Sequence, residues 1–242
     1  MMTTRRNVFV ATTAVLTSIA FSAAGGRLEA AAPNAKPLRV ACVGDSITVG
    51  VGTAVPERDA YPKQLAALLG AGWDVRSFGV SGTTVLNITG YPWAGTAERD
   101  AAIASKPDVV IIALGTNDCN PEKWSHKAHY LDDYRALIEL FRKLESKPKI
   151  YVATPVPFGP LYNNHIAGLE EQIVLIGQLA REEKLTVIDM NTALKGREEL
   201  IPDSVHPNTI GAGIMARTAF KALTGREAPS PAANVVPAGV VK

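Results

Sequence analysis

The sequence predicts a doubly wound α/β domain, in which a parallel sheet is covered by helices on both faces. Short apolar segments alternate along the chain with longer amphipathic segments, which is the order of strands and helices in such folds. The apolar segments are nearly continuous in Val, Ile, Leu and Ala, as in 108–114, and this is typical of strands buried on both faces. Clusters of Gly and polar residues follow them, where a parallel sheet places its ligand sites.

Five strand candidates and five helical segments make up the expected domain. The strand candidates are 38–43, 73–78, 108–114, 149–154 and 185–189. The helical segments are 61–69, 97–105, 131–144, 166–183 and 207–223. Segment 131–144 repeats its apolar residues at positions i, i+3 and i+4, and Pro207 suits the first position of the last helix. We therefore expect one folded domain at 36–224, a size that can be stable without disulfides or metal.

Residues 1–32 have the order of an export signal. A basic start at Arg5 and Arg6 is followed by the uncharged apolar run 8–24 and by small residues at 30–32. The arginine pair resembles a twin-arginine signal. An uncleaved membrane anchor is the alternative, because an apolar run of about 17 residues is at the lower limit for a spanning helix. We expect a periplasmic or extracellular protein without stable membrane insertion after cleavage.

Charge and composition exclude some functions for the domain itself. The net charge of +2 comes from residues 1–32, and no block of Lys or Arg elsewhere would suit a nucleic acid. The tail 225–242 is rich in Pro, Ala and Val without periodicity, and we expect it to be disordered. Cys42 and Cys119 match no zinc spacing. Export would permit a disulfide between them, and two buried thiols are the preferred interpretation.

Four polar clusters follow the predicted strands. They are the segments 44–46, 79–82, 115–118 and 203–206. Because the carboxyl ends of parallel strands share one edge of a sheet, we expect these distant segments to meet at one rim. Their convergence is a stronger indication of a site than any one of them alone.

The residue types in these clusters suit nucleophilic catalysis. The Ser46 hydroxyl needs a base to take its proton, and His206 is the candidate base. Asp203, three residues before it, can hold the imidazole in one tautomer. The backbone N–H groups of Ser46 and Gly79 and the side-chain amide of Asn117 are candidate donors to an oxyanion. The alternative for Ser46 is that it only caps the helix after the first strand.

Taken together, the four clusters resemble the SGNH, or GDSL-type, hydrolases. Gly44-Asp45-Ser46-Ile47-Thr48 matches the first block, and the others follow in family order, so the resemblance covers 38–223. It implies a flavodoxin-like three-layer α/β/α sandwich with a five-stranded parallel sheet. It also implies a catalytic Ser46, Asp203 and His206 and an oxyanion hole from Ser46, Gly79 and Asn117. Cys119 departs from the pattern, since Ser or Thr is expected there.

Within that family the chain is most similar to bacterial carbohydrate O-acetylesterases, particularly those called sialate O-acetylesterases. Supporting stretches are 61–65, 78–84 and 91–93. The resemblance implies a serine esterase that removes small acyl groups, chiefly acetyl, from a carbohydrate without any cofactor or metal. Tyr91 and Trp93 are candidates for stacking on a sugar, as is Trp124, and the alternative is that these aromatics pack within their loops.

Two other functions are weighed against this one. A lipid-ester or thioester hydrolase, of the lysophospholipase or thioesterase kind, would need an apolar channel, whereas loops 80–96 and 155–165 contain Ser, Thr, Asn, Tyr and His. A non-catalytic glycan-binding envelope protein would have lost a member of the triad, and none is missing. His126 and His129 have metal-like spacing without an evident third ligand, so we expect a surface pair. The expected partner is a small-molecule or glycan acyl ester, and the sugar and the oligomeric state stay open.

Overall fold

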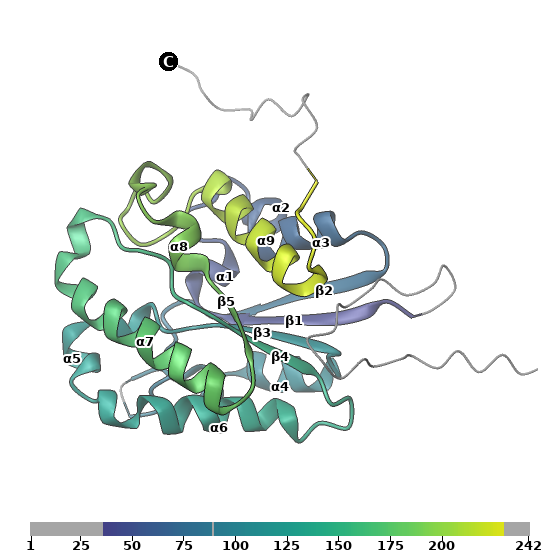
Figure 1. Cartoon of the computed structure of the whole chain (residues 1–242), viewed down its shortest axis with the longest axis horizontal. Helices are drawn as coiled ribbons and strands as arrows, with labels where there is room; N and C mark the ends of the chain where they lie inside the picture. Colours follow the sequence, from purple (N-terminus) through teal and green to yellow (C-terminus); the bar gives the residue numbers. More distant parts are fainter. Residues whose placement is uncertain (1–35, 89, 230–242) are drawn as a thin grey trace, which may run out of the picture.

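The computed structural model describes residues 36–88 and 90–229 (Figure 1). The predicted export signal and most of the predicted tail lie outside these residues. The strands are β1 Leu38–Gly44, β2 Trp73–Gly79, β3 Val109–Ala113, β4 Lys149–Ala153 and β5 Thr186–Ile188. The α-helices are α1 Ser46–Val49, α2 Pro56–Asp59, α3 Tyr61–Leu69, α4 Ala97–Ala104, α5 Pro121–Trp124, α6 Tyr130–Arg142, α7 Ile166–Glu182, α8 Met190–Leu194 and α9 Thr209–Thr224. The 3-10 helices are η1 Trp93–Gly95, η2 Asn117–Cys119, η3 Lys127–His129, η4 Pro160–His165 and η5 Glu198–Leu200.

The five strands form one parallel sheet in the order β2-β1-β3-β4-β5. The strand order reverses direction at β1, so the loops after β1 and its neighbours β2 and β3 come together at one edge. Ligands bind at such switch points in open α/β sheets. Gly44 at the end of β1 pairs with Gly79 of β2 on one side and with Ala113 of β3 on the other.

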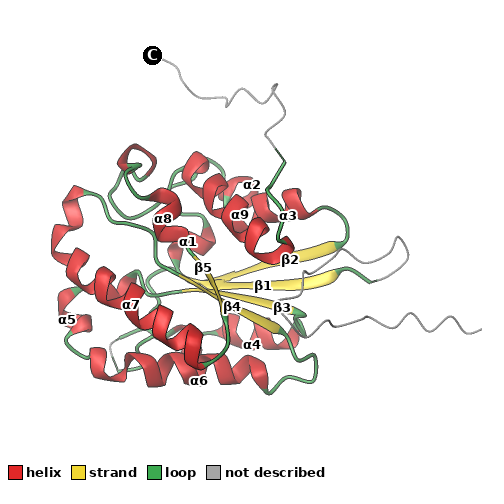
Figure 2. Ribbon diagram, in the orientation of Figure 1, coloured by secondary structure: helices red, strands yellow, loops and turns green. Residues whose placement is uncertain are grey.

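Helices cover both faces of the sheet, which confirms the predicted three-layer α/β/α fold. Figure 2 shows α3 and α9 on one side of the strands and α4 and α6 on the other. Residues of β3 alternate between the two cores: Val109 and Ile111 pack with α3, α8 and α9, whereas Val110 and Ile112 pack with α4, α6 and α7. All four are fully buried, which explains why this strand is continuously apolar.

Two boundaries near the C-terminus differ from the prediction. Helix α9 begins at Thr209, because Asn208 caps it by accepting hydrogen bonds from the N–H groups of Ile210 and Gly211 at 3.0 Å each. Pro207 therefore precedes the cap and is not the first helical residue. Residues 226–229, expected as the start of a disordered tail, lie against α9, where Ala228 is buried.

Among the described residues, no helix is long and apolar enough to cross a membrane.

Candidate active site

Ser46, His206 and Asp203 form one hydrogen-bonded chain. The Ser46 Oγ atom is 2.9 Å from Nε2 of His206, and Nδ1 of His206 is 2.6 Å from Oδ2 of Asp203. Oδ1 of Asp203 accepts the backbone N–H groups of Val205 and His206. Partial burial acts to raise the pKa of Asp203, but the hydrogen bonds from His206 and Val205 outweigh it and hold this pKa below its ordinary value. The carboxylate is therefore ionised when it orients the imidazole.

The start of α1 presents the serine. Asp45 is the N-cap, and its Oδ1 accepts the N–H of Ile47 at 2.9 Å. Ser46 is the first residue of α1 and does not cap it, so the capping alternative for Ser46 is wrong. Asp45 is itself buried, and this burial raises its pKa to about 6. Gly50 ends α1 with φ +102°, a left-handed conformation that suits glycine.

Gly79 must be a glycine because the first turn of α1 packs against it. A Cβ at this position would lie 2.7 Å from the backbone N of Val49 and 2.9 Å from the carbonyl O of Asp45. The backbone of Gly79 therefore lies beside the helix that starts at Ser46. The joint role of the Ser46 and Gly79 N–H groups as oxyanion donors stays a prediction.

A hydrogen bond to the loop after β2 orients the side chain of Asn117. Its Nδ2 donates to the carbonyl O of Thr83 at 2.9 Å, and Thr83 is fully buried. Because an amide NH₂ carries two hydrogens, one can hold this bond while the second donates to a substrate oxygen. This hydrogen bond fixes the Asn117 side chain, and its role as an oxyanion donor stays a prediction.

Asp118 ties the same two loops together. Its Oδ2 and Oδ1 accept the N–H groups of Val85 at 3.0 Å and of Leu86 at 2.8 Å. The carboxylate is fully buried, and burial raises its pKa to about 6 despite these hydrogen bonds. Asp118 therefore joins the turn that carries Asn117 to the loop that carries Thr83.

Gln172 of α7 supports the Asn117 turn from the other side, and the sequence analysis did not identify it. Its Nε2 donates to Sγ of Cys119 at 3.1 Å, and its Oε1 accepts from the Tyr130 hydroxyl at 3.3 Å. A Cβ at Gly115 would lie 2.4 Å from the same Oε1, so the turn and this side chain are in tight contact. The available signal was a polar residue on the apolar stripe of 166–183, between Leu169 and Ile176.

The three candidate stacking residues differ in exposure. Tyr91 is 51% exposed, whereas Trp93 is 0% exposed and donates its Nε1–H to the carbonyl O of Phe78. A fully buried ring cannot stack on a sugar, so the expectation for Trp93 is wrong and its loop-packing alternative holds. Trp124 is 7% exposed and donates its Nε1–H to Oε2 of Glu171 at 3.1 Å, so little of its ring is available for stacking.

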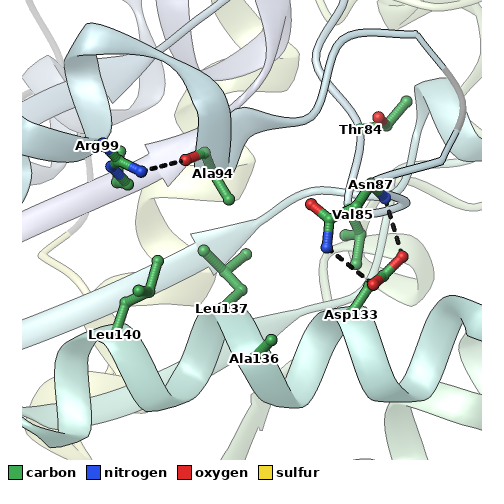
Figure 3. Close-up of a pocket in the computed structure, with 9 residues that line it drawn as sticks. All are labelled: Thr84, Val85, Asn87, Ala94, Arg99, Asp133, Ala136, Leu137 and Leu140. Atoms are coloured by element: carbon green, nitrogen blue, oxygen red, sulfur yellow. Dashed lines mark hydrogen bonds between the residues drawn. The ribbon is translucent and has the colours of Figure 1, made fainter.

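A cavity of about 130 Å³ lies between the loop after β2 and α6 (Figure 3). It is lined by Thr84, Val85, Asn87, Ala94, Arg99, Asp133, Ala136, Leu137 and Leu140. Asn87 donates to Asp133 twice, from its backbone N–H and its side chain, and Arg99 donates to the carbonyl O of Ala94. The cavity contains no triad or oxyanion residue. The two hydrogen bonds from Asn87 to Asp133 anchor the loop after β2, which contains Thr83, to α6.

Cys42 and Cys119 are both buried free thiols, which agrees with the interpretation preferred from the sequence. In the described part of the chain, no group of three or more His, Cys, Asp or Glu residues is arranged to hold a metal ion.

Comparisons with known proteins find a matching family and a similar sequence. Residues 42–214 match the GDSL-like Lipase/Acylhydrolase family. An acetylxylan esterase of Xylanibacter ruminicola is 36% identical over 205 residues, which is 76% of this chain and 43% of that protein. The chain thus spans less than half the length of this relative.

Two solved structures share the fold. A carbohydrate acetylesterase family member from Sinorhizobium meliloti superposes with a TM-score of 0.64 at 19% identity, covering 78% of this chain and 100% of the other. The native aryl esterase of M. smegmatis gives a TM-score of 0.61 at 20% identity, covering 76% and 97%.

Proposed function

Because the chain belongs to the GDSL-like lipase/acylhydrolase family, we propose that it is a serine esterase that removes O-acetyl groups from a carbohydrate. The observation that carries the proposal is the continuous chain of hydrogen bonds from Ser46 through His206 to Asp203. The relative named acetylxylan esterase supports a sugar as the alcohol.

The first half of the reaction transfers the acetyl group to the enzyme. His206 Nε2 accepts the Ser46 proton while Oγ forms a bond to the ester carbonyl carbon. The carbonyl oxygen becomes an oxyanion, which accepts hydrogen bonds from the backbone N–H groups of Ser46 and Gly79 and from Asn117 Nδ2. The tetrahedral intermediate collapses, the carbon–oxygen bond to the sugar breaks, and His206 gives its proton to the departing sugar oxygen. Asp203 stabilises the imidazolium between these steps.

The second half releases acetate. His206 takes a proton from a water molecule, whose oxygen attacks the acetyl carbonyl carbon. The same donors hold the second oxyanion. The bond to Ser46 Oγ then breaks, His206 returns the proton to that oxygen, and acetic acid leaves. No cofactor or metal enters either half of this scheme.

We place this activity outside the cytoplasm, in the periplasm or the extracellular medium. The basic, apolar and small-residue order of residues 1–32 supports export.

The direct test is acetate release from a panel of O-acetylated xylan, pectin, peptidoglycan and sialic acids. The Ser46→Ala variant should lose about 10⁴–10⁶-fold in kcat, because the nucleophile is gone while binding groups remain. Ser105→Ala, whose hydroxyl bonds a carbonyl of α4 remote from the triad, is a matched control and should keep full activity. Hydrolysis by Ser46→Ala near the wild-type rate would overturn the mechanism. Cleavage of long-chain acyl esters without acetate release from any sugar would favour a lipid esterase instead.

A further inference from the structure

The segment that follows β4 bridges the two turns that hold the catalytic groups. The N–H of Gly159 donates to the carbonyl O of Ser204 at 2.9 Å, and Ser204 lies between Asp203 and His206. A Cβ at Gly159 would lie 2.6 Å from the Ser204 Oγ and 2.9 Å from its Cα. The backbone that enters η4 is therefore in van der Waals contact with the turn that supplies the acid and the base.

The same segment also reaches the oxyanion turn. Phe158 packs in one small apolar cluster with Cys119 and Leu169, and Val205 packs against that cluster. Cys119 ends the turn that starts at Asn117, and Val205 precedes His206. Residues 158 and 159, which lead into η4, therefore contact both the turn that carries His206 and the turn that carries Asn117.

Four side chains of η4 form what we call the η4 platform: Leu161, Tyr162, Asn164 and His165. Leu161 is 76% exposed and Tyr162 is 36% exposed. The Tyr162 ring is held by its neighbours, with its centroid 5.9 Å from that of Phe158 in a stacked arrangement and 5.0 Å from that of His165 edge to face. These contacts order the ring, and its 36% exposure leaves part of it accessible to a ligand.

The platform continues into a cavity of about 260 Å³ between η4, α5 and the start of α7. Its lining residues are Cys119, Pro121, Trp124, Ser125, Lys127, Asn164, Ala167 and Gly168. Asn164 belongs to both the cavity and the platform, and Trp124 also lines the cavity. The volume is near the lower end of ligand pockets, about 300 Å³, which suits one sugar unit rather than a long acyl chain.

The charge of this surface is balanced. Lys127 is the one charged side chain among the lining residues of the cavity, and its Nζ is 2.5 Å from Oε2 of Glu171. Burial lowers the pKa of His165, which favours its neutral imidazole at neutral pH. Amide, hydroxyl and neutral imidazole groups can exchange hydrogen bonds with sugar hydroxyls, whereas a carboxylated sugar would meet an already paired lysine.

Resting on the proposed esterase function, we infer that the η4 platform and the adjoining cavity form a subsite for an uncharged polysaccharide chain, which binds the sugar next to the acetylated one. Tyr162 supplies the stacking surface, and Asn164 and His165 supply polar contacts at its edge. The substrate of this enzyme is then an acetylated neutral glycan chain rather than an acetylated monosaccharide or an acidic sugar.

The test compares kcat/KM on four acetate esters: O-acetylated xylo-oligosaccharides, acetylated xylose, O-acetylated sialic acid and p-nitrophenyl acetate. The wild type should prefer the oligosaccharides to the monosaccharide at least tenfold. Tyr162→Ala should lower kcat/KM on the oligosaccharides by about 5–20-fold, mainly through KM, and should leave p-nitrophenyl acetate within about twofold. Tyr162→Phe, which keeps the ring, should retain most of the activity on the chain. Val174→Ala, an exposed change on α7, is the surface control.

Each contrary outcome has its own meaning. Equal losses for Tyr162→Ala on the oligosaccharides and on p-nitrophenyl acetate would show that the platform only supports the catalytic turn, and would overturn the subsite. Unchanged activity on the oligosaccharides would overturn it while leaving the esterase proposal intact. A preference for O-acetylated sialic acid would overturn the neutral-chain assignment. Loss of acetate release from every sugar, with p-nitrophenyl acetate still cleaved, would refute the carbohydrate function itself.

Discussion

The acid–base turn 203–206 and the oxyanion turn 115–119, which act on the same ester in the proposed mechanism, are built in opposite ways. Asp203 is half-exposed, and its partners are the backbone N–H groups of Val205 and His206 and the His206 ring, all within three residues. Asp118 is fully buried, and its partners are backbone N–H groups 32 and 33 residues away. The first turn is a local motif, whereas the second depends on contacts between loops that only the sheet brings together.

This difference predicts whether a substitution in each turn mainly lowers the catalytic rate or also lowers the stability of the fold. A change in the acid–base turn removes a proposed catalytic group from a motif that can otherwise keep its shape, so the rate should fall more than the stability. A change in the oxyanion turn disturbs buried long-range contacts, so stability should suffer along with chemistry. Three substitutions and one pH experiment can sharpen or break this comparison.

Asp203→Asn should produce the largest effect on the rate after loss of the nucleophile. The neutral amide cannot stabilise the imidazolium and favours the wrong tautomer of His206, so kcat should fall by about 10⁴-fold. The free energy of unfolding should change by less than about 1 kcal/mol, because the side chain is half-exposed. Steady-state kinetics and urea titration measure the two quantities. A large loss of stability would place Asp203 in the same class as Asp118.

Asn117→Ala should lower kcat by about 10²–10³-fold if its Nδ2 donates to the oxyanion. KM should change little, since the interaction strengthens in the transition state. Asn120→Ala is a useful control, because Asn120 lies in the same segment and its side chain only caps α5. An unchanged kcat for Asn117→Ala would remove it from the oxyanion hole.

Asp118→Asn should lower the free energy of unfolding more than Asp203→Asn or Asn117→Ala does, and it should lower kcat less. The amide NH₂ would face one of the N–H groups of Val85 and Leu86 that now donate to a carboxylate oxygen. One buried donor would lose its acceptor, so we expect a loss of about 1–3 kcal/mol in the free energy of unfolding. The kcat should fall about tenfold through the loosened turn. A variant as stable as the wild type would contradict the proposed tie between the loops.

The pH dependence of stability should reveal Asp118 independently. Its folded pKa of about 6 lies above the ordinary value of 3.8, so between these values the folded protein binds more protons than the unfolded chain. The contribution of Asp118 to the free energy of unfolding therefore rises as pH falls from 6 towards 4. Relative to Asp118→Asn, the free energy of unfolding of the wild type should rise by about 2 kcal/mol over that range. Urea titrations of both proteins from pH 7 to pH 4 measure this gain, and a constant difference would contradict it.

Much of the fold follows from patterns that are local in the sequence. The apolar run around Ile111 and Ile112 predicts a strand buried on both faces, and the structure confirms it. Helix boundaries are harder to predict. Pro207 suits the first position of a helix, but the next residue, Asn208, caps α9, so the helix begins at Thr209. Trp93 and Tyr91 are near neighbours in one loop with opposite exposure, and no pattern in the sequence separates them.

The sequence by itself determined the alternation of strands and helices and the four polar clusters at the strand ends. It also supplied a candidate nucleophile, base and carboxylate in Ser46, His206 and Asp203. Asp203 and His206 could be paired from sequence because three residues and one turn separate them. Only the tertiary structure decided that Thr83 orients Asn117, that Asp118 joins two loops, and that Gln172 supports the turn. These contacts join residues 32 to 53 positions apart, and the order of strands in the sheet, not local preference, brings them within hydrogen-bond distance.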